Sequence, residues 1–284
     1  MRFVDTLLDS SRRRQSLLCI GLDPLPDRIP APLRAAPDPI FAFCTAIMDA
    51  TADVACAFKP NIAFFEALGA SGIETLQKLF RLPRAVPMIL DAKRGDIGST
   101  AEAYARLVFD VLQADAVTLS PYLGGDALEP FLRYAERGCF VLCKTSNPGS
   151  ADLQDLALAD GRPLFLEVAR TAYERWNANE NVGLVVGATH TSAIAAVRAI
   201  CPSLPLLVPG VGTQGGELAA AVRAAVDAAG ERALINASRS VLYADSSTGF
   251  ADAARAEAIR LRDAINAARA VDAVAESGPS APTF

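Results

Sequence analysis

Eight short apolar segments recur along the chain, and each ends in polar or charged residues. Segments of this length, without strict alternation, are typical of strands that are buried on both faces of a parallel sheet. Segments in which apolar residues follow helical spacing lie between them. The predicted strands are residues 17–22, 54–58, 87–90, 116–120, 140–143, 183–187, 206–208 and 233–236.

This alternation of strands and helices decides the expected fold class. Eight strand and helix pairs fit a single (β/α)8 TIM barrel, an α/β fold, better than an open sheet. The amino-acid composition does not change along the chain in a way that would indicate a second domain, so residues 1–275 are expected to form one barrel domain. Residues 276–284 lack periodicity and are expected to form a disordered tail. Residues 147–160 form a longer polar connection after the fifth strand, in the position of a mobile lid.

The composition narrows the function classes. A net charge of -5 argues against nucleic-acid binding, which requires a basic face. No apolar run suits a signal-peptide core or spans a bilayer, so we expect a cytoplasmic protein that does not bind membranes. The six cysteines form no Cys-x-x-Cys pair, which indicates buried, reduced thiols. The only histidine, His190, cannot build a His-rich metal site, and we interpret it as a residue with local hydrogen bonds.

Charged residues follow the third predicted strand directly. Asp91 and Lys93 are two residues apart, so both side chains should point inward over the mouth of a barrel. Asp96 lies beyond the strand and cannot be assumed to face the same pocket. Ser99 and Glu102 fit a capping box, which predicts that Ser99 starts the next helix. The alternative for this stretch is a solvated turn with a surface ion pair.

Lysine is rare in this chain, which contains 27 basic residues. Three of the four lysines stand at the ends of apolar runs. An ammonium group can give up a proton, which a guanidinium does not do in proteins, so this placement indicates chemistry. One of these three, Lys144, has no role that the sequence assigns, and we expect it at the surface. The four lysines are Lys59, Lys78, Lys93 and Lys144.

A glycine-rich turn follows the seventh predicted strand, and a polar turn that contains Arg239 follows the eighth. Residues 209–216 come after the seventh strand, and residues 236–240 come after the eighth. In barrels these two loops commonly bind a phosphate group through backbone amides. Gln214 and Arg239 can add side-chain donors. The two turns together therefore predict a phosphate site.

The string Asp-Ala-Lys-Arg-Gly-Asp-Ile at residues 91–97, together with four further segments, resembles the orotidine 5′-phosphate decarboxylase family. The core Asp-x-Lys-x-x-Asp alone also occurs in related barrels that process phosphosugars, so the longer set makes the resemblance specific. It extends over all eight predicted strands, and the chain length is similar to that of the longer bacterial subgroup. The further segments are residues 22–24, 58–61, 209–212 and 238–239.

The resemblance implies a catalytic array of alternating charge, formed by Lys59, Asp91, Lys93 and Asp96. It also implies a homodimer in which Asp96 and Thr100 reach into the site of the other subunit. The implied reaction is the decarboxylation of orotidine 5′-monophosphate (OMP) to UMP, the last step of de novo pyrimidine nucleotide synthesis. No metal and no organic cofactor is implied.

Substrate contacts are implied in the same way. Asp23 and Lys59 match residues that contact ribose hydroxyls, and Ser146 matches the serine that reads the pyrimidine edge. Gln214 and Arg239 match phosphate ligands. Ser238 stands where many relatives have glycine, and its amide can still bind phosphate. The complete implied set is Asp23, Lys59, Thr100, Ser146, Gln214, Ser238 and Arg239.

The chemistry of the array agrees with this reaction. Loss of CO₂ from C6 of a pyrimidine leaves a carbanion without an adjacent electron sink. Lys93 would stabilise the developing charge and then protonate C6. Asp91 would lie beside the departing carboxylate, and binding energy from the remote phosphate would hold the geometry.

Three other functions stay open from the sequence. The first is a metal-dependent phosphosugar lyase of the hexulose-phosphate synthase type, although Lys59 and Lys93 stand where a metal would bind. The second is a Schiff-base aldolase that uses Lys93 or Lys144. The third is a nucleotide-binding barrel without catalytic activity. For single residues, Asp23 could cap the turn before Pro24, and Gln214 could brace its own loop.

Overall fold

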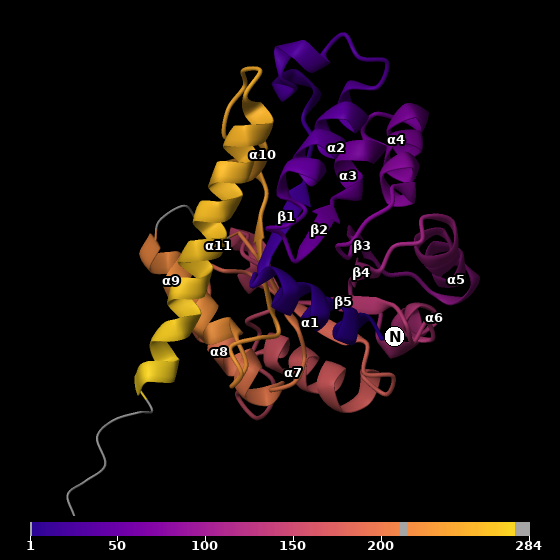
Figure 1. Cartoon of the computed structure of the whole chain (residues 1–284). Helices are drawn as coiled ribbons and strands as arrows, with labels where there is room; N and C mark the ends of the chain where they lie inside the picture. The colour runs from indigo at the N-terminus through magenta and orange to yellow at the C-terminus, as the bar shows by residue number, and fades with distance from the viewer. Residues whose placement is uncertain (1, 211–214, 276–284) are drawn as a thin grey trace, which may run out of the picture.

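The computed structural model describes residues 2–210 and 215–275, and within them the strands form one parallel barrel (Figure 1). The sheet order is β2-β1-β8-β7-β6-β5-β4-β3. Isolated parallel bridges, Phe58 with Met88 and Asn61 with Asp91, bring β2 and β3 together and complete the ring. The predicted TIM barrel is therefore confirmed. The strands are β1 Leu18–Leu22, β2 Ala57–Pro60, β3 Ile89–Arg94, β4 Ala116–Leu119, β5 Gly138–Lys144, β6 Val182–Val186, β7 Leu206–Pro209 and β8 Ala233–Ala237.

Helices surround the barrel, and α11 packs along α2 and α9 (Figure 1). In the described part of the chain, no helix is long and apolar enough to cross a membrane. The α-helices are α1 Phe3–Arg14, α2 Pro39–Thr51, α3 Ile62–Glu66, α4 Ala70–Arg81, α5 Gly98–Arg106, α6 Gly125–Leu132, α7 Leu164–Thr171, α8 Thr191–Ile200, α9 Gly215–Ala225, α10 Arg239–Leu242 and α11 Phe250–Ala275. Short 3-10 helices cover Pro26–Arg28 (η1), Ala31–Leu33 (η2) and Pro148–Asp152 (η4), and π-helical turns cover Leu107–Val111 (η3) and Ala172–Trp176 (η5).

The second strand lies later in the chain than its apolar run predicts. The prediction is residues 54–58, whereas β2 is Ala57–Pro60. Parallel pairing with β1, from Cys19 opposite Ala57 to Leu22 opposite Pro60, sets this position. Lys59 consequently lies inside the strand.

The helix after β3 begins differently from the predicted capping box. Helix α5 starts at Gly98, and Ile97 occupies the N-cap position without a side-chain hydrogen bond. Gly98 has a φ of +53°, a left-handed conformation that glycine adopts without steric cost. The prediction that Ser99 starts this helix is therefore wrong, because the glycine turns the chain one residue earlier.

Helix α1 closes the N-terminal end of the barrel. Its apolar residues pack against the inward-facing side chains of the strands in one cluster. Phe3 contacts Phe140 of β5 edge to face, with ring centroids 5.8 Å apart. Because this end is filled, the C-terminal end is left for a ligand, as is usual for the fold.

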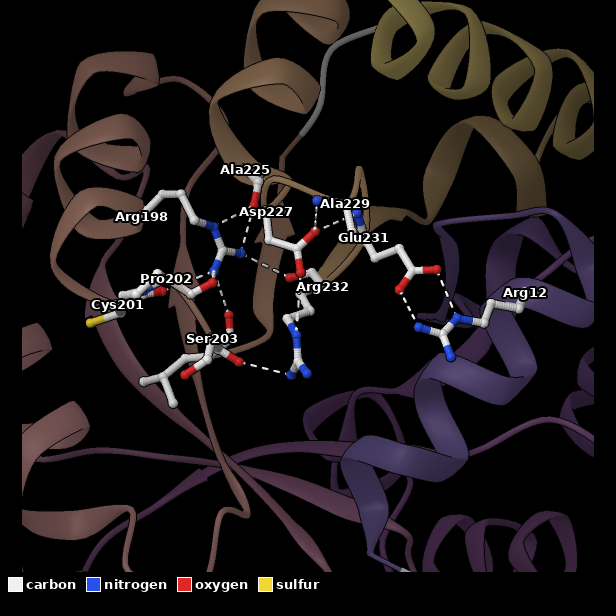
Figure 2. A network of polar contacts seen from close by, with 11 residues as sticks. Arg12, Arg198, Cys201, Pro202, Ser203, Ala225, Asp227, Ala229, Glu231 and Arg232 are labelled. Atoms are coloured by element: carbon white, nitrogen blue, oxygen red, sulfur yellow. Dashed lines mark hydrogen bonds and ion pairs between the residues drawn. The ribbon is translucent and has the colours of Figure 1, made fainter. Parts of the chain in front are cut away.

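A polar network lies beside α1, where β7 and β8 begin (Figure 2). The Arg198 guanidinium donates six hydrogen bonds of 2.6–3.2 Å, all of them to backbone carbonyl oxygens. Asp227 accepts hydrogen bonds from two amides of its own loop and pairs with Arg232 at 3.2 Å. Arg12 of α1 pairs with Glu231. The network therefore joins the loops before β7 and β8 to each other and to α1.

Candidate active site

A cavity of about 630 Å³ opens at the C-terminal end of the barrel. Its lining comes from β2, β3, β7 and β8 and from the segments that follow β1, β2, β7 and β8. All strands of a parallel barrel end at this edge, so residues far apart in sequence meet here. The described lining residues are Asp23, Arg28, Lys59, Asn61, Asp91, Pro209, Gly210, Asn236, Ala237, Ser238, Arg239 and Ser240.

Three charged side chains form a continuous cluster at this cavity. Lys59 Nζ lies 2.7 Å from Asp91 Oδ2, and Lys93 Nζ lies 2.6 Å from Asp91 Oδ1. Only 4% of the Lys59 side chain is exposed, whereas 50% of the Lys93 side chain is exposed. Lys59 therefore holds the carboxylate from within the barrel, whereas Lys93, which is not one of the lining residues, contacts the same carboxylate from a half-exposed position. Lys59, Asp91 and Lys93 of the predicted array are brought together.

The backbone at Lys93 departs from simple strand alternation. Lys93 has a φ of +49°, and the pairing of β3 with β4 shifts register at this point. A left-handed conformation costs a residue with a side chain about 1–2 kcal/mol. The buried Thr118 hydroxyl of β4 accepts hydrogen bonds from the amides of Ala92 and Lys93, both at 3.0 Å, and donates to Asp91 Oδ1 at 2.9 Å. Thr118 therefore stabilises both the bulge and the carboxylate.

Burial and charge act in opposite directions on this cluster. Burial alone would raise the pKa of Asp91, but the charges of Lys59 and Lys93 outweigh it and hold that pKa well below its usual range. Burial also opposes the Lys59 ammonium, yet the carboxylates of Asp91 and Asp23 leave the pKa of Lys59 raised. Lys59 and Asp91 are therefore both ionised at neutral pH.

Both carboxylate oxygens of Asp91 already contact ammonium groups. Among residues 2–210 and 215–275, no group of three or more His, Cys, Asp and Glu side chains is arranged to hold a metal ion.

Two polar atoms of the cavity residues are buried without a hydrogen-bond partner among the residues described. These atoms are Asp23 Oδ1 and Asn236 Oδ1. A buried acceptor without a donor is costly, so native proteins leave few of them unpaired. Donors from a ligand, such as sugar hydroxyls, would satisfy this part of the cavity wall.

Arg239 and Ser238 line the cavity, as predicted for residues that contact the substrate. Ser238 is turned toward β1, because a Cβ atom placed on Gly21 would lie 1.9 Å from the Ser238 hydroxyl. A side chain at position 21 would therefore require the Ser238 hydroxyl to move. Gln214 lies outside the described residues.

Ser146 lies beside the segments that follow β6 and β7. A Cβ atom at Gly187 would come within 2.9 Å of Ser146, and one at Gly210 would lie 3.5 Å from the Ser146 hydroxyl. Gly210 lines the cavity, so Ser146 is placed at the cavity edge. This position is compatible with the predicted contact to a base.

The prediction that Lys144 lies at the surface is wrong. Only 3% of the Lys144 side chain is exposed. Its ammonium group contacts Asp155 Oδ1 at 2.7 Å and Ser150 Oγ at 3.1 Å. Gln154 also accepts a hydrogen bond from the Thr145 amide at 2.9 Å. The start of the connection at residues 147–160 is therefore tied back onto the end of β5.

Asp96 and Thr100 do not join the cluster of their own chain. Asp96 accepts a hydrogen bond from the Ile97 amide at 2.8 Å, and no hydrogen bond or ion pair to Lys93 occurs in the described residues. Thr100 is exposed on α5. Both residues lie at the rim, outside the cavity lining.

The cysteines and His190 are not among the described residues that line the cavity. All six cysteines are buried and unpaired, which confirms the prediction of reduced thiols. Burial raises the pKa of the Cys19 thiol to about 12. His190 Nε2 is buried and lacks a hydrogen-bond partner among the residues described, so the expected local bond is absent at that atom.

Sequence reasoning missed several residues at the site. Thr118 and Asn236 interrupt strands that are otherwise apolar, which is a signal that could have identified them. Asn61 also lines the cavity, but its side chain caps α3 through the Ala63 amide. Arg28 lies within a proline-rich stretch that carries no such signal.

Comparison with known proteins decides the family. The model of the "Orotidine 5'-phosphate decarboxylase / HUMPS family" matches residues 16–254. The chain belongs to this family. It is 64% identical over 268 residues to the orotidine 5'-phosphate decarboxylase of Roseiflexus sp. (strain RS-1), with 94% of this chain and 98% of the relative covered. It is 55% identical over 276 residues to that of Paracidovorax citrulli (strain AAC00-1), with 95% and 100% covered.

A solved structure supports the same assignment. The Leishmania donovani OMP decarboxylase superposes with a TM-score of 0.83 at 45% identity, and the alignment covers 95% of this chain and 99% of that one. The family resemblance and the decarboxylase identification predicted from residues 91–97 are therefore confirmed. The roles of individual site residues stay predictions.

Proposed function

We propose that this protein decarboxylates OMP to UMP as a carboxy-lyase of pyrimidine nucleotide synthesis. The observation that carries the proposal is the Lys59–Asp91–Lys93 cluster beside a cavity that also contains Arg239. The family and its decarboxylase members at 64% and 55% identity support it. A cytoplasmic location belongs to the same proposal.

The geometry suits the reaction because Lys93 is the accessible member of the cluster. As the C6–CO₂ bond breaks, its electron pair stays on C6, and the Lys93 ammonium stabilises that charge. Lys93 then donates a proton to C6 and regains one from solvent. Asp91, held between two ammonium groups, fixes the position of the Lys93 ammonium and would lie next to the departing carboxylate.

The substrate contacts extend this proposal. Ribose hydroxyls would donate to the unpaired oxygen of Asp23, near Lys59. Ser146, beside Gly210 at the cavity edge, would contact the base. Arg239 would bind the phosphate, with Ser238 and Gln214 as the further predicted contacts.

The direct test is a spectrophotometric assay with OMP in the presence of EDTA. We expect a full absorbance change at substrate concentration with UMP as product. Activity that EDTA abolishes would favour a metal-dependent phosphosugar lyase, although both Asp91 oxygens contact ammonium groups. Trapping of substrate by borohydride would favour a Schiff-base aldolase, and tight UMP binding without turnover would favour a non-catalytic barrel.

We further propose a homodimer in which each subunit lends Asp96 and Thr100 to the other site. Within the described residues, Asp96 makes no hydrogen bond or ion pair with the cluster of its own chain, although it follows Lys93 by only three positions. Large apolar side chains are exposed nearby, with Ile97 61% and Tyr122 77% exposed. The loops that carry them touch, because the Ser120 amide donates to the Arg94 carbonyl. An apolar surface beside the site supports a two-fold partner.

Mixing two inactive variants tests this arrangement. Asp96→Asn and Lys93→Ala are each expected to be nearly inactive. After dissociation, equal mixing and reassociation, about half the dimers are mixed, and each contains one intact site. Activity should then recover to about a quarter of the wild-type value. If Asp96 serves its own subunit, every site keeps a lesion and mixing restores nothing.

A further inference from the structure

Arg28 is a second guanidinium group at the cavity. It is the last residue of η1, in the connection that follows β1, and it lines the same cavity as Asp23 and Arg239. Arg239 begins α10, which follows β8, the neighbour of β1 in the barrel. Two segments more than 200 residues apart in sequence therefore each bring an arginine to the cavity.

An aromatic ring holds Arg28 in place. The guanidinium carbon lies 3.9 Å from the centroid of the Tyr243 ring. The Tyr243 hydroxyl accepts a hydrogen bond from the Leu25 amide at 2.6 Å and donates to the Asp23 carbonyl at 3.1 Å. The ring also stacks on the buried Phe43, with centroids 5.9 Å apart. Tyr243 therefore fixes both the loop that carries Arg28 and the direction of its side chain, which lowers the entropy cost of binding a ligand.

The charges around Arg28 point to an anion. No carboxylate pairs with Arg28 or with Arg239 within residues 2–210 and 215–275, whereas both ammonium groups of the cluster are neutralised in part by Asp91. Planar guanidinium groups bind phosphate oxygens through paired hydrogen bonds. Two arginines without acidic partners match a dianion better than a neutral sugar.

We infer that Arg28 binds the 5′-phosphate of the nucleotide together with Arg239, so that recognition uses a pair of arginines, one after β1 and one after β8. This inference rests on the proposed function. It makes Arg28 a residue that distinguishes nucleotides from nucleosides. The Tyr243 ring positions Arg28 for that contact.

Binding of UMP and uridine to the Arg28→Met variant tests the inference by calorimetry. Loss of one charged hydrogen-bond partner should weaken UMP binding about tenfold, whereas uridine, which lacks the phosphate, should bind as it does to the wild type. The matched control is Arg81→Met, an exposed arginine at the end of α4, which should change neither affinity. Thermal unfolding of both variants checks that they are folded.

Two results would overturn the inference. One is an unchanged UMP affinity in Arg28→Met. The other is an equal loss of UMP and uridine affinity, which would mean that Arg28 contacts the ribose or supports its own loop and does not bind the phosphate. The proposed function is tested separately, because it fails if the wild-type protein does not decarboxylate OMP. Binding of UMP against uridine is measurable in either case.

Discussion

Charged side chains lie at both ends of the barrel, but their partners differ between the two ends. At the N-terminal end, Arg198 directs all of its hydrogen bonds to backbone carbonyls. At the C-terminal end, Asp91 is shared by Lys59 and Lys93, whose side chain is half exposed. The first arrangement leaves little for a ligand to contact. The second keeps a reactive group within reach, which is the difference between a structural and a chemical use of charge.

Electrostatics separate the two ends as well. Burial lowers the pKa of Arg198 to about 10, and nearby acidic groups only partly oppose that effect. For Asp91, the two lysines outweigh burial and lower its pKa. The guanidinium is thus stabilised by neutral dipoles, whereas the carboxylate depends on opposite charges. Substitutions at the two ends should therefore affect different measurements.

Lys93→Ala should produce the largest effect, and on activity. Turnover should fall about a thousandfold or more, because the variant lacks the proton donor at C6. Stability should change little, since the side chain is half exposed and the buried Lys59 still pairs with Asp91. Turnover of OMP and binding of UMP are the measurements.

Lys78→Ala is the matched control for this prediction. Lys78 is exposed and pairs with Asp38 on the outer surface, so activity should stay at the wild-type level.

Arg239→Ala should instead weaken UMP binding by about 2–5 kcal/mol. If Lys93→Ala lost UMP affinity to the same extent, the assigned roles of Lys93 and Arg239 would be wrong.

Asp91→Asn should lower stability by about 3–5 kcal/mol at neutral pH, because it leaves the buried Lys59 ammonium without its partner. The pKa of Asp91 is lowered in the folded state, so its contribution is present above the unfolded-state pKa of about 3.9. That contribution is lost as the pH falls from there through the lower folded-state pKa. Urea unfolding of both proteins from neutral to acidic pH measures it. A stability difference that did not shrink below about pH 4 would contradict this account.

Arg198→Met should lower the free energy of unfolding by about 3 kcal/mol, because several loop carbonyls lose their donor. Turnover per folded molecule should stay the same, since Arg198 lies at the opposite end of the barrel from the cavity. The control is Arg260→Met on the outer face of α11, which should change stability by less than about 0.5 kcal/mol. A variant with normal stability and reduced turnover would show that the two ends are coupled.

Arg12→Gln should produce the smallest effect. Arg12 belongs to the same network as Arg198 but is exposed, and its ion pair with Glu231 is screened by solvent. Chemical unfolding should show a difference from the wild type that is smaller than for Arg198→Met and that disappears at high salt. A loss of stability as large as that of Arg198→Met would mean that the Arg12–Glu231 ion pair contributes as much to stability as the hydrogen bonds of Arg198.

Sequence alone was sufficient for the features that depend on local pattern. Short apolar runs predicted the strands, because a strand buried on both faces needs apolar residues at nearly every position. The charged residues that end the third run predicted that Asp91 and Lys93 meet at the barrel mouth, since parallel strands of a barrel finish at one edge. The family resemblance added Lys59 to this pair. The glycine turn after β7 and Arg239 after β8 followed from the same rule.

Tertiary structure alone decided which polar groups find partners. Lys144 follows the same pattern as Lys59, yet it is buried against Asp155 rather than at the cavity. Thr118 stabilises the bulge at Lys93 from the neighbouring strand, and Arg28 reaches the cavity because Tyr243 lies beneath it. Hydrogen bonds and stacking depend on contacts between segments far apart in the chain. The sequence shows which buried polar groups need a hydrogen-bond partner. The fold determines which residue becomes that partner.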